Sequence, residues 1–224
     1  MMFHVAMLLQ LISSAGATQA SSAQTASEAL VRRVLGTAHA AQFVVDTTAP
    51  PGTMGIGSQS SKVVLRGSNG VEVAAALSWY LNAYCNTTFD WSNYEVLLPD
   101  AKALPLPAAA SRARYTNYTY YLNVCTFGYS LVWKDWTYWQ KHIDWMAMQG
   151  INLPLALAGQ EKVIVNTFAR FNVSAQELSE NYFAGPAFLP WGRMGNLQKW
   201  GGPLPLTWVD QQAALQVDPQ MPVL

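Results

Sequence analysis

Polar side chains that could bind a ligand fall near the ends of two expected strands. The first strand is expected over residues 119–126, and alternation along a strand places Asn123 and Cys125 on the same face. The second is expected over the apolar run 151–157, with Glu161 just past its end. An amide donates and accepts hydrogen bonds, so these groups suit a polar ligand. The alternative is that Asn123 and Cys125 are only core residues near a strand end, since buried polar groups need partners in any fold.

A helix between these two strands is expected to bring the polar groups together. Residues 134–149 carry an inward stripe, and Asp135 and Gly150 suit the start and end of a helix; the stripe is Trp136, Trp139, Ile143, Met146 and Ala147. A strand, helix and strand of this length form a right-handed crossover with parallel strands. Both strands then end at the same edge, which is the active-site face in a barrel of alternating strands and helices. The expected fold class is therefore α/β.

The chain before this unit is expected to form a small α/β domain over residues 22–104. Its expected elements are a helix over 27–36 capped by Ser27, a strand over 42–46, a loop over 47–61, a strand over 62–66, a turn over 67–70, a helix over 71–85 and a strand over 94–98. A linker rich in Pro and Ala follows over residues 105–113. Residues 114–224 are then the N-terminal portion of the barrel.

The barrel portion continues with helices and one long irregular loop. Helices are expected over residues 161–171 and, from a capping box that pairs Ser174 with Glu177, over residues 174–183. Residues 185–208 are expected to form a single loop rich in Gly, Pro and Trp, followed by a helix over 208–217 and the opening of a strand at 221–224. Long structured loops after barrel helices often carry function.

Composition excludes several classes of protein. Lys plus Arg and Asp plus Glu are equal at 13 each, so bulk charge gives no indication of nucleic-acid binding. No apolar run outside the N-terminus is long enough to cross a membrane, although 51% of the residues are hydrophobic. No His or Cys pair has metal-ligand spacing, and no Gly-rich phosphate loop or Gly-x-Ser-x-Gly elbow occurs. Neither a metal nor a cofactor is expected.

The N-terminus indicates the secretory pathway. Residues 1–20 resemble a signal peptide, with a short apolar core and a small-x-small cleavage pattern. Three glycosylation sequons agree with this interpretation and begin at Asn86, Asn117 and Asn172. A secreted chain with two cysteines also invites a disulfide between Cys85 and Cys125.

Two long segments resemble the lysosomal alpha-N-acetylglucosaminidase family of glycoside hydrolases. They read LNVCTFGYSLVWKDWTYWQKHIDWMAMQGINLPLALAGQE and FAGPAFLPWGRMGNLQKWGGPLPLTW. The resemblance is close from about Arg114 to Trp208 and weaker before that. It implies an exo-acting enzyme that removes terminal α-linked N-acetylglucosamine, as in heparan sulfate, with a small N-terminal α/β domain followed by a (β/α)8 barrel. It allows a homo-oligomeric full-length enzyme in the lysosome, the vacuole or the extracellular space.

The resemblance also implies roles for single residues. Asn123 and Cys125 would line the sugar pocket, Trp191 would form a wall, Tyr129 would support them, and Glu161 would be a pocket residue. Cys125 would then be free rather than bridged. The family's two catalytic glutamates lie downstream of these motifs, so the 224 residues are expected to be inactive alone. The alternative is a non-catalytic secreted protein that binds carbohydrate or a partner through its aromatic loop.

Overall fold

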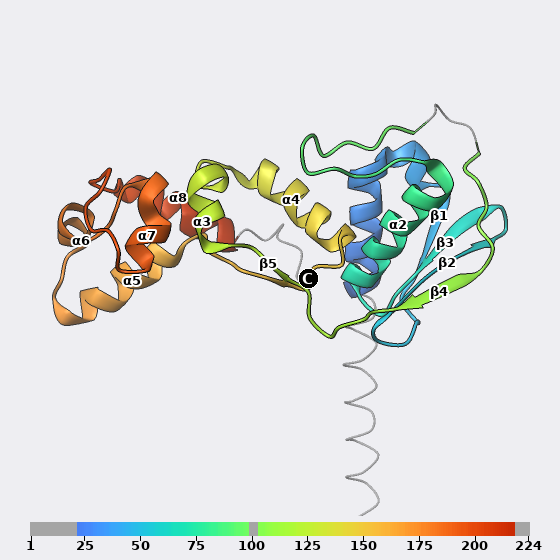
Figure 1. Cartoon of the computed structure of the whole chain (residues 1–224), viewed down its shortest axis with the longest axis horizontal. Helices are drawn as coiled ribbons and strands as arrows, with labels where there is room; N and C mark the ends of the chain where they lie inside the picture. Colours follow the sequence, from blue (N-terminus) through green and yellow to red (C-terminus); the bar gives the residue numbers. More distant parts are fainter. Residues whose placement is uncertain (1–21, 99–102, 218–224) are drawn as a thin grey trace, which may run out of the picture. The chain divides into compact units, whose positions relative to one another are not determined.

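The computed structural model describes residues 22–98 and 103–217 (Figure 1). These residues divide into two compact units. Unit 1 contains residues 22–98, 103–119 and 141–152, and unit 2 contains residues 120–140 and 153–217. Each unit has a hydrophobic core of its own. No helix among the described residues combines the length and the apolar character that a membrane span requires.

Unit 1 is built on a four-stranded mixed sheet in the order β1-β3-β2-β4. The strands are β1 (Phe43–Asp46), β2 (Thr53–Gln59), β3 (Lys62–Arg66) and β4 (Ala110–Ala113). The pair β1 and β3 is parallel, with Phe43 opposite Val63, whereas β2 is antiparallel to both of its neighbours. Alternation along β3 sends Val63 and Leu65 into the core of the unit.

Two helices cover one face of this sheet, a helix over residues 22–40 and α2 (Gly70–Cys85) (Figure 1). Asn69 caps α2, because its side chain accepts a hydrogen bond from the backbone N–H of Glu72. The Glu72 carboxylate is buried and accepts from the backbone N–H groups of Gly52 and Ser68, at 2.7 and 2.6 Å. These bonds fasten the loop before β2 to the first turn of α2.

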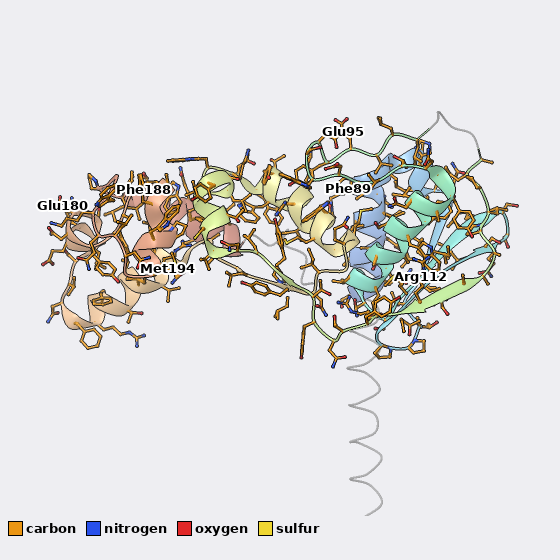
Figure 2. All side chains as sticks on the ribbon, in the orientation of Figure 1. Phe89, Glu95, Arg112, Glu180, Phe188 and Met194 are labelled. Atoms are coloured by element: carbon orange, nitrogen blue, oxygen red, sulfur yellow. The ribbon has the colours of Figure 1, made fainter. Side chains whose placement is uncertain are left out.

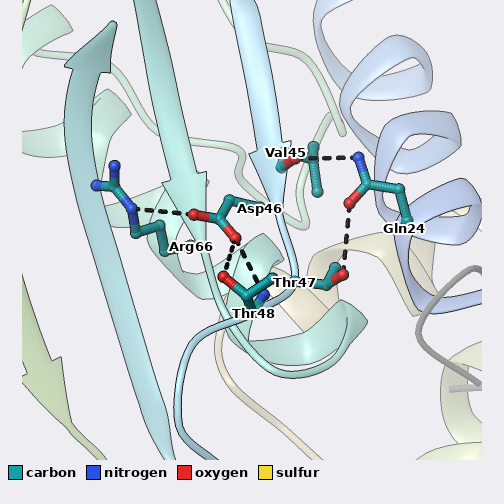
Figure 3. Close-up of polar contacts among 6 residues, drawn as sticks. All are labelled: Gln24, Val45, Asp46, Thr47, Thr48 and Arg66. Carbon is teal, nitrogen blue, oxygen red and sulfur yellow. Dashed lines mark hydrogen bonds and ion pairs between the residues drawn. The ribbon is translucent and has the colours of Figure 1, made fainter. Parts of the chain in front are cut away.

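The outer strand β1 is attached to the helix over residues 22–40 through a set of polar contacts (Figure 3). The Gln24 amide donates to the carbonyl of Val45 at 3.0 Å and accepts from the Thr47 hydroxyl at 3.4 Å. At the end of the strand, the Asp46 carboxylate accepts from Thr48 and from Arg66. The Thr48 hydroxyl, with help from Arg66, lowers the pKa of Asp46.

The helix α4 (Trp136–Met148) contributes its later residues to unit 1. There the Asp144 carboxylate receives two hydrogen bonds from the Arg33 guanidinium, at 2.6 and 2.8 Å. On the same helix His142 is buried, its Nδ1 lies 2.6 Å from the Tyr94 hydroxyl, and its ring stacks on Trp145. Burial lowers the pKa of His142 to about 4, so the imidazole is neutral at pH 5 and above.

Unit 2 contains one short parallel strand pair and a series of helices. The strands are β5 (Tyr120–Tyr121) and β6 (Leu153–Pro154), and Tyr120 lies opposite Leu153. The helical elements are α3 (Val124–Thr126), the π-helical turn η1 (Phe127–Leu131), α5 (Gln160–Phe168), η2 (Ala169–Phe171), α6 (Ala175–Asn181), η3 (Pro186–Phe188), α7 (Leu189–Arg193) and α8 (Leu206–Val217). Their apolar faces meet in a core that includes Leu122, Phe127, Leu178 and Trp208.

Several elements agree with the sequence-based expectations. The expected strands over 42–46 and 62–66 and the helix over 71–85 correspond to β1, β3 and α2. The helix over 134–149 is α4, with Gly150 in the left-handed conformation after it. The capping box at Ser174 is present with both of its hydrogen bonds, and the parallel crossover is confirmed by the pairing of β5 with β6.

The two expected barrel strands are much shorter than predicted. The strand over 119–126 ends at Tyr121, and the strand over 151–157 is reduced to Leu153–Pro154. Asn123 ends the first strand, because its side chain bonds locally to the backbone and starts α3. The prediction that Asn123 and Cys125 share a strand face is therefore wrong, and the helical turns α3 and η1 occupy the chain between Val124 and Leu131.

Other corrections concern the small domain and the aromatic loop. Residues 47–61 contain β2, residues 94–98 contain no strand, the helix expected over 27–36 spans 22–40, and the linker over 105–113 ends in β4. Ser27 does not cap its helix, since its hydroxyl donates to the carbonyl of Ala23 inside it. The loop expected over 185–208 contains η3 and α7 and the beginning of α8. The expected signal peptide and the expected strand at 221–224 lie outside the described residues.

Candidate functional site

Asn123 and Cys125 lie together at the first turn after β5. The Asn123 Oδ1 accepts a hydrogen bond of 2.8 Å from the backbone N–H of Cys125, which makes Asn123 the cap of α3. Asn123 is exposed and Cys125 is half-buried. Because Oδ1 is bonded to the backbone, the Nδ2 donors of this exposed side chain are the groups best able to make further hydrogen bonds. Cys125 carries a free thiol, as the family resemblance implied, and Cys85 is also free.

The segment after Cys125 packs residue by residue against α7. A Cβ on Gly128 would lie 2.8 Å from the carbonyl oxygen of Ala187 and 2.9 Å from Cγ of Pro190, so this approach requires glycine. The residue after Gly128 and the residue after Pro190 are both aromatic. Tyr129 and Trp191 meet edge to face, with ring centroids 5.3 Å apart and an interplanar angle of 81°. The close backbone contact at Gly128 thus creates an aromatic corner, defined here as Tyr129 and Trp191.

Phe188, which is labelled in Figure 2, immediately precedes α7 and extends this aromatic group. Its ring centroid lies 6.4 Å from that of Trp191 and 5.9 Å from that of Trp200. Tyr129 is 73% exposed, whereas Trp191 is half-buried. In the aromatic corner the Tyr129 ring is therefore accessible, and Trp191 is packed against a further aromatic side chain, Phe188.

A buried ion pair between Arg193 and Glu161 joins the end of α7 to α5. Both Glu161 carboxylate oxygens accept from the Arg193 guanidinium, Oε1 from Nε at 2.8 Å and Oε2 from Nη2 at 2.9 Å. The side chain of Glu161 is 1% exposed and that of Arg193 is 9% exposed. The guanidinium also lies 5.0 Å from the ring centroid of Phe127. This two-point geometry holds the end of α7 on the first turn of α5.

The structure brings four of the five predicted site residues to neighbouring elements. Asn123 caps α3 and Cys125 lies on it, Tyr129 is on η1, and Trp191 is on α7, which packs against both α3 and η1. Glu161 differs, because both of its oxygens are used by Arg193 and the side chain is buried. Sequence reasoning missed Arg193 and Gly128. The only signal for Arg193 was its rarity, as one of two cations, with Lys199, in the loop expected over 185–208 of a chain with 12% charged residues.

The groups of this arrangement have the chemistry that suits a polar molecule with an apolar face. Amide donors at Asn123 suit hydroxyl or carbonyl oxygens, and an indole suits the C–H face of a ring. The residues described in unit 2 do not place two free carboxylates opposite each other at this site. Among all described residues, no group of three or more His, Cys, Asp or Glu side chains could hold a metal ion.

Comparisons with known proteins connect both units to one family. Residues 25–108 match the alpha-N-acetylglucosaminidase N-terminal domain, and residues 119–218 match the alpha-N-acetylglucosaminidase tim-barrel domain. A curated human protein, alpha-N-acetylglucosaminidase, is 42% identical over 217 residues, which cover 92% of this chain and 29% of the human protein. The chain therefore spans less than a third of the length of that relative.

Solved structures give the same relationship. The family 89 glycoside hydrolase from Clostridium perfringens, in complex with 2-acetamido-1,2-dideoxynojirmycin, is 29% identical, with a TM-score of 0.83; the match covers 94% of this chain and 24% of that chain. A form of the bacterial enzyme with two Glu-to-Gln substitutions, in complex with its substrate GlcNAc-alpha-1,4-galactose, has 29% identity, the same coverage and a TM-score of 0.82.

Proposed function

Since this chain belongs to the alpha-N-acetylglucosaminidase family, we propose that its protein is a glycoside hydrolase that removes terminal α-linked N-acetylglucosamine. The natural substrates are glycans such as heparan sulfate. The observation that carries this proposal is the similarity, at a TM-score of 0.82, to a bacterial enzyme in complex with GlcNAc-alpha-1,4-galactose. No cofactor takes part.

The described residues supply the sugar-binding side of this site. Asn123 donates from Nδ2 to an oxygen of the sugar, beside the free thiol of Cys125. Trp191 forms the wall on which the C–H face of the sugar packs, and Tyr129 supports its edge. Glu161 contributes to the pocket through its ion pair with Arg193.

The bond-breaking groups of the proposed mechanism come from outside the 224 residues. A retaining glycosidase needs two carboxyl groups about 5–5.5 Å apart, one as nucleophile and one as acid and base. The family resemblance places both glutamates downstream of the motifs in this chain. Two Glu-to-Gln substitutions in the bacterial enzyme held with its substrate support a mechanism with two glutamates. The residues in hand bind and orient the sugar, and alone they are inactive.

The proposed compartment is the secretory pathway, ending in the lysosome, the vacuole or the extracellular space. It is supported by the signal-like residues 1–20 and by the exposure of the sequon residues Asn86, Asn117 and Asn172. Asn172 follows a short helical turn, and Asn86 follows α2. Glycosylation at the three sequons belongs to the same proposal, and removal of N-glycans would increase the mobility of the mature protein on a gel.

The decisive test is hydrolysis of 4-nitrophenyl N-acetyl-α-D-glucosaminide by the protein expressed from its full gene. We expect hydrolysis, and we expect Trp191→Ala to raise KM by about tenfold, because stacking that contributes about 1.4 kcal/mol corresponds to that factor. Trp91→Ala is the matched control, since Trp91 is a 60% exposed tryptophan in unit 1. Sugar binding without any hydrolysis would instead favour a carbohydrate-binding protein.

A further inference from the structure

We infer that the ion pair between Glu161 and Arg193 positions the aromatic corner of Tyr129 and Trp191 against the sugar. This inference rests on the proposed function, because it assigns the pair a role at the same site. Glu161 then acts through Arg193 and α7 rather than through contact with the substrate. Both residues are positioning residues, and the aromatic corner is the group that they hold in place.

Three consecutive residues of η1 each contact a residue of α7. Phe127 lies under the Arg193 guanidinium, Gly128 touches Pro190, and Tyr129 meets Trp191. The first two contacts therefore set the orientation of the third. A shift of α7 along η1 would separate Tyr129 from Trp191 and would open the corner.

The attachment of α7 to α5 prevents such a shift. The helix α7 is only five residues long, Leu189–Arg193, and so short a helix has little stability of its own. Its last residue, Arg193, is bound at two points to Glu161 in the first turn of α5. Two parallel hydrogen bonds restrain both the position and the rotation of the guanidinium. The pair thus connects the helix that carries Trp191 to the helix that follows β6.

Glu161 is buried and cannot reach the sugar itself. With 1% exposure and both oxygens occupied, its carboxylate has no free acceptor surface for a sugar hydroxyl. A buried charge that bonded to nothing else would be costly, so loss of either partner forces a rearrangement at α7. That rearrangement reaches Trp191, which is two residues before Arg193.

The test is a double-mutant cycle in the protein expressed from its full gene. KM and kcat for 4-nitrophenyl N-acetyl-α-D-glucosaminide are measured for wild type, Glu161→Gln, Trp191→Ala and the double variant. We expect Glu161→Gln to raise KM on the order of tenfold, with a smaller change in kcat, because the wall is misplaced. In the Trp191→Ala background the same change should leave KM nearly unaltered, because no wall remains to be misplaced.

Three companion variants sharpen this result. Arg193→Lys keeps the charge but loses the two-point geometry, so it should repeat the effect of Glu161→Gln, and it replaces that variant if Glu161→Gln does not fold. Lys162→Gln breaks the neighbouring exposed ion pair with Asp210 and should leave KM unchanged. In protein labelled with 5-fluorotryptophan, the ¹⁹F resonance of Trp191, assigned by its loss in Trp191→Phe, should move in Glu161→Gln but not in Lys162→Gln.

The possible outcomes separate this inference from the proposed function. If Glu161→Gln multiplies KM by the same factor with and without Trp191, the pair does not act through Trp191 and the inference is overturned. If the wild-type protein does not hydrolyse the substrate, the proposed function fails, and the ¹⁹F spectrum still decides the positioning role. An unmoved Trp191 resonance in both Glu161→Gln and Arg193→Lys would refute it.

Discussion

At the scale of single residues, charge is rare in this protein and each buried charge has a definite partner. Glu72 is bound by backbone N–H groups, Asp144 by Arg33, and Glu161 by Arg193. An unpaired buried charge costs several kcal/mol, so such a group is found with a partner or in its neutral form. His142 is buried in its neutral form. It is 2% exposed, and burial lowers its pKa to about 4.

His142 should make the stability of the protein depend on pH. Its pKa is lower in the folded state than the 6.5 of an exposed histidine. Between pH 6.5 and pH 4 the unfolded chain binds the proton more readily, so the unfolding free energy falls as the pH falls. The expected loss is about 3 kcal/mol, complete once the pH lies below the folded-state pKa. Urea unfolding at a series of pH values measures it.

The matched variant is His142→Asn, whose side chain does not titrate and can still bond to Tyr94. Asp144 has a pKa that burial raises, so its contribution has the opposite sign, and the difference between the two proteins removes it. The wild-type curve should fall more steeply than the variant curve on acidification from pH 7 to pH 4. Parallel curves would show that His142 does not titrate as a buried neutral group.

At the scale of elements, neighbouring segments are held by a few directional contacts. The approach of η1 to α7 depends on Gly128, and the attachment of β1 to the helix over residues 22–40 depends on Gln24. The helix over residues 22–40 is fastened to α4 by the pair of Arg33 and Asp144. Such contacts join elements that are distant in sequence, and they explain why short elements are stable here.

Two ion pairs of different burial should differ strongly in their effect on stability. Asp144 is 4% exposed and receives two hydrogen bonds from Arg33, whereas Asp210 is 64% exposed in its pair with Lys162. Asp144→Asn leaves Arg33 without a charged partner and should lower the unfolding free energy by about 3 kcal/mol. Asp210→Asn should change it by less than about 1 kcal/mol. Equal losses in chemical denaturation would contradict this ranking.

At the scale of the whole molecule, the chain forms two units with separate cores. Residues 25–108, all in unit 1, match the N-terminal domain of the family, and the barrel-domain match over residues 119–218 covers unit 2 together with residues 141–152 of unit 1. The proposed catalytic function belongs to the whole enzyme, since the chain spans 29% of the human relative and 24% of the bacterial one. The binding side of the proposed site lies within unit 2 alone. Unit 1 carries none of the predicted sugar-binding residues.

The two cysteines provide a test at this scale. Cys85 belongs to unit 1 and Cys125 to unit 2, and both are free. Iodoacetamide added to the denatured protein without reductant should therefore alkylate both, and peptide mapping identifies the two modified peptides. The same mapping after reduction is the control and should give the same result. Alkylation that appears only after reduction would indicate a disulfide at these positions.

The sequence by itself determined the features that depend on local patterns. Hydrophobic periodicity located α2 and α4, and the Ser174 capping box located α6, because these signals lie within a few residues of each other. It also indicated the parallel crossover of β5 and β6 and the family, through two long motifs. Four of the five predicted sugar-binding residues lie on neighbouring elements, but Tyr129 and Trp191 were assigned to the site through the family resemblance and not through a local pattern.

Only the tertiary structure decided the features that depend on distant partners. The strand β2 has a Gly- and Ser-rich sequence that resembles a loop, and it is a strand because both of its neighbours pair with it. Tyr94 lies against His142 rather than in a sheet. The role of Glu161 changed most, because a carboxylate at a strand end suggests a ligand until Arg193, thirty-two residues later, is found to occupy both of its oxygens. Side-chain pairing across such distances leaves no periodic signal in the sequence.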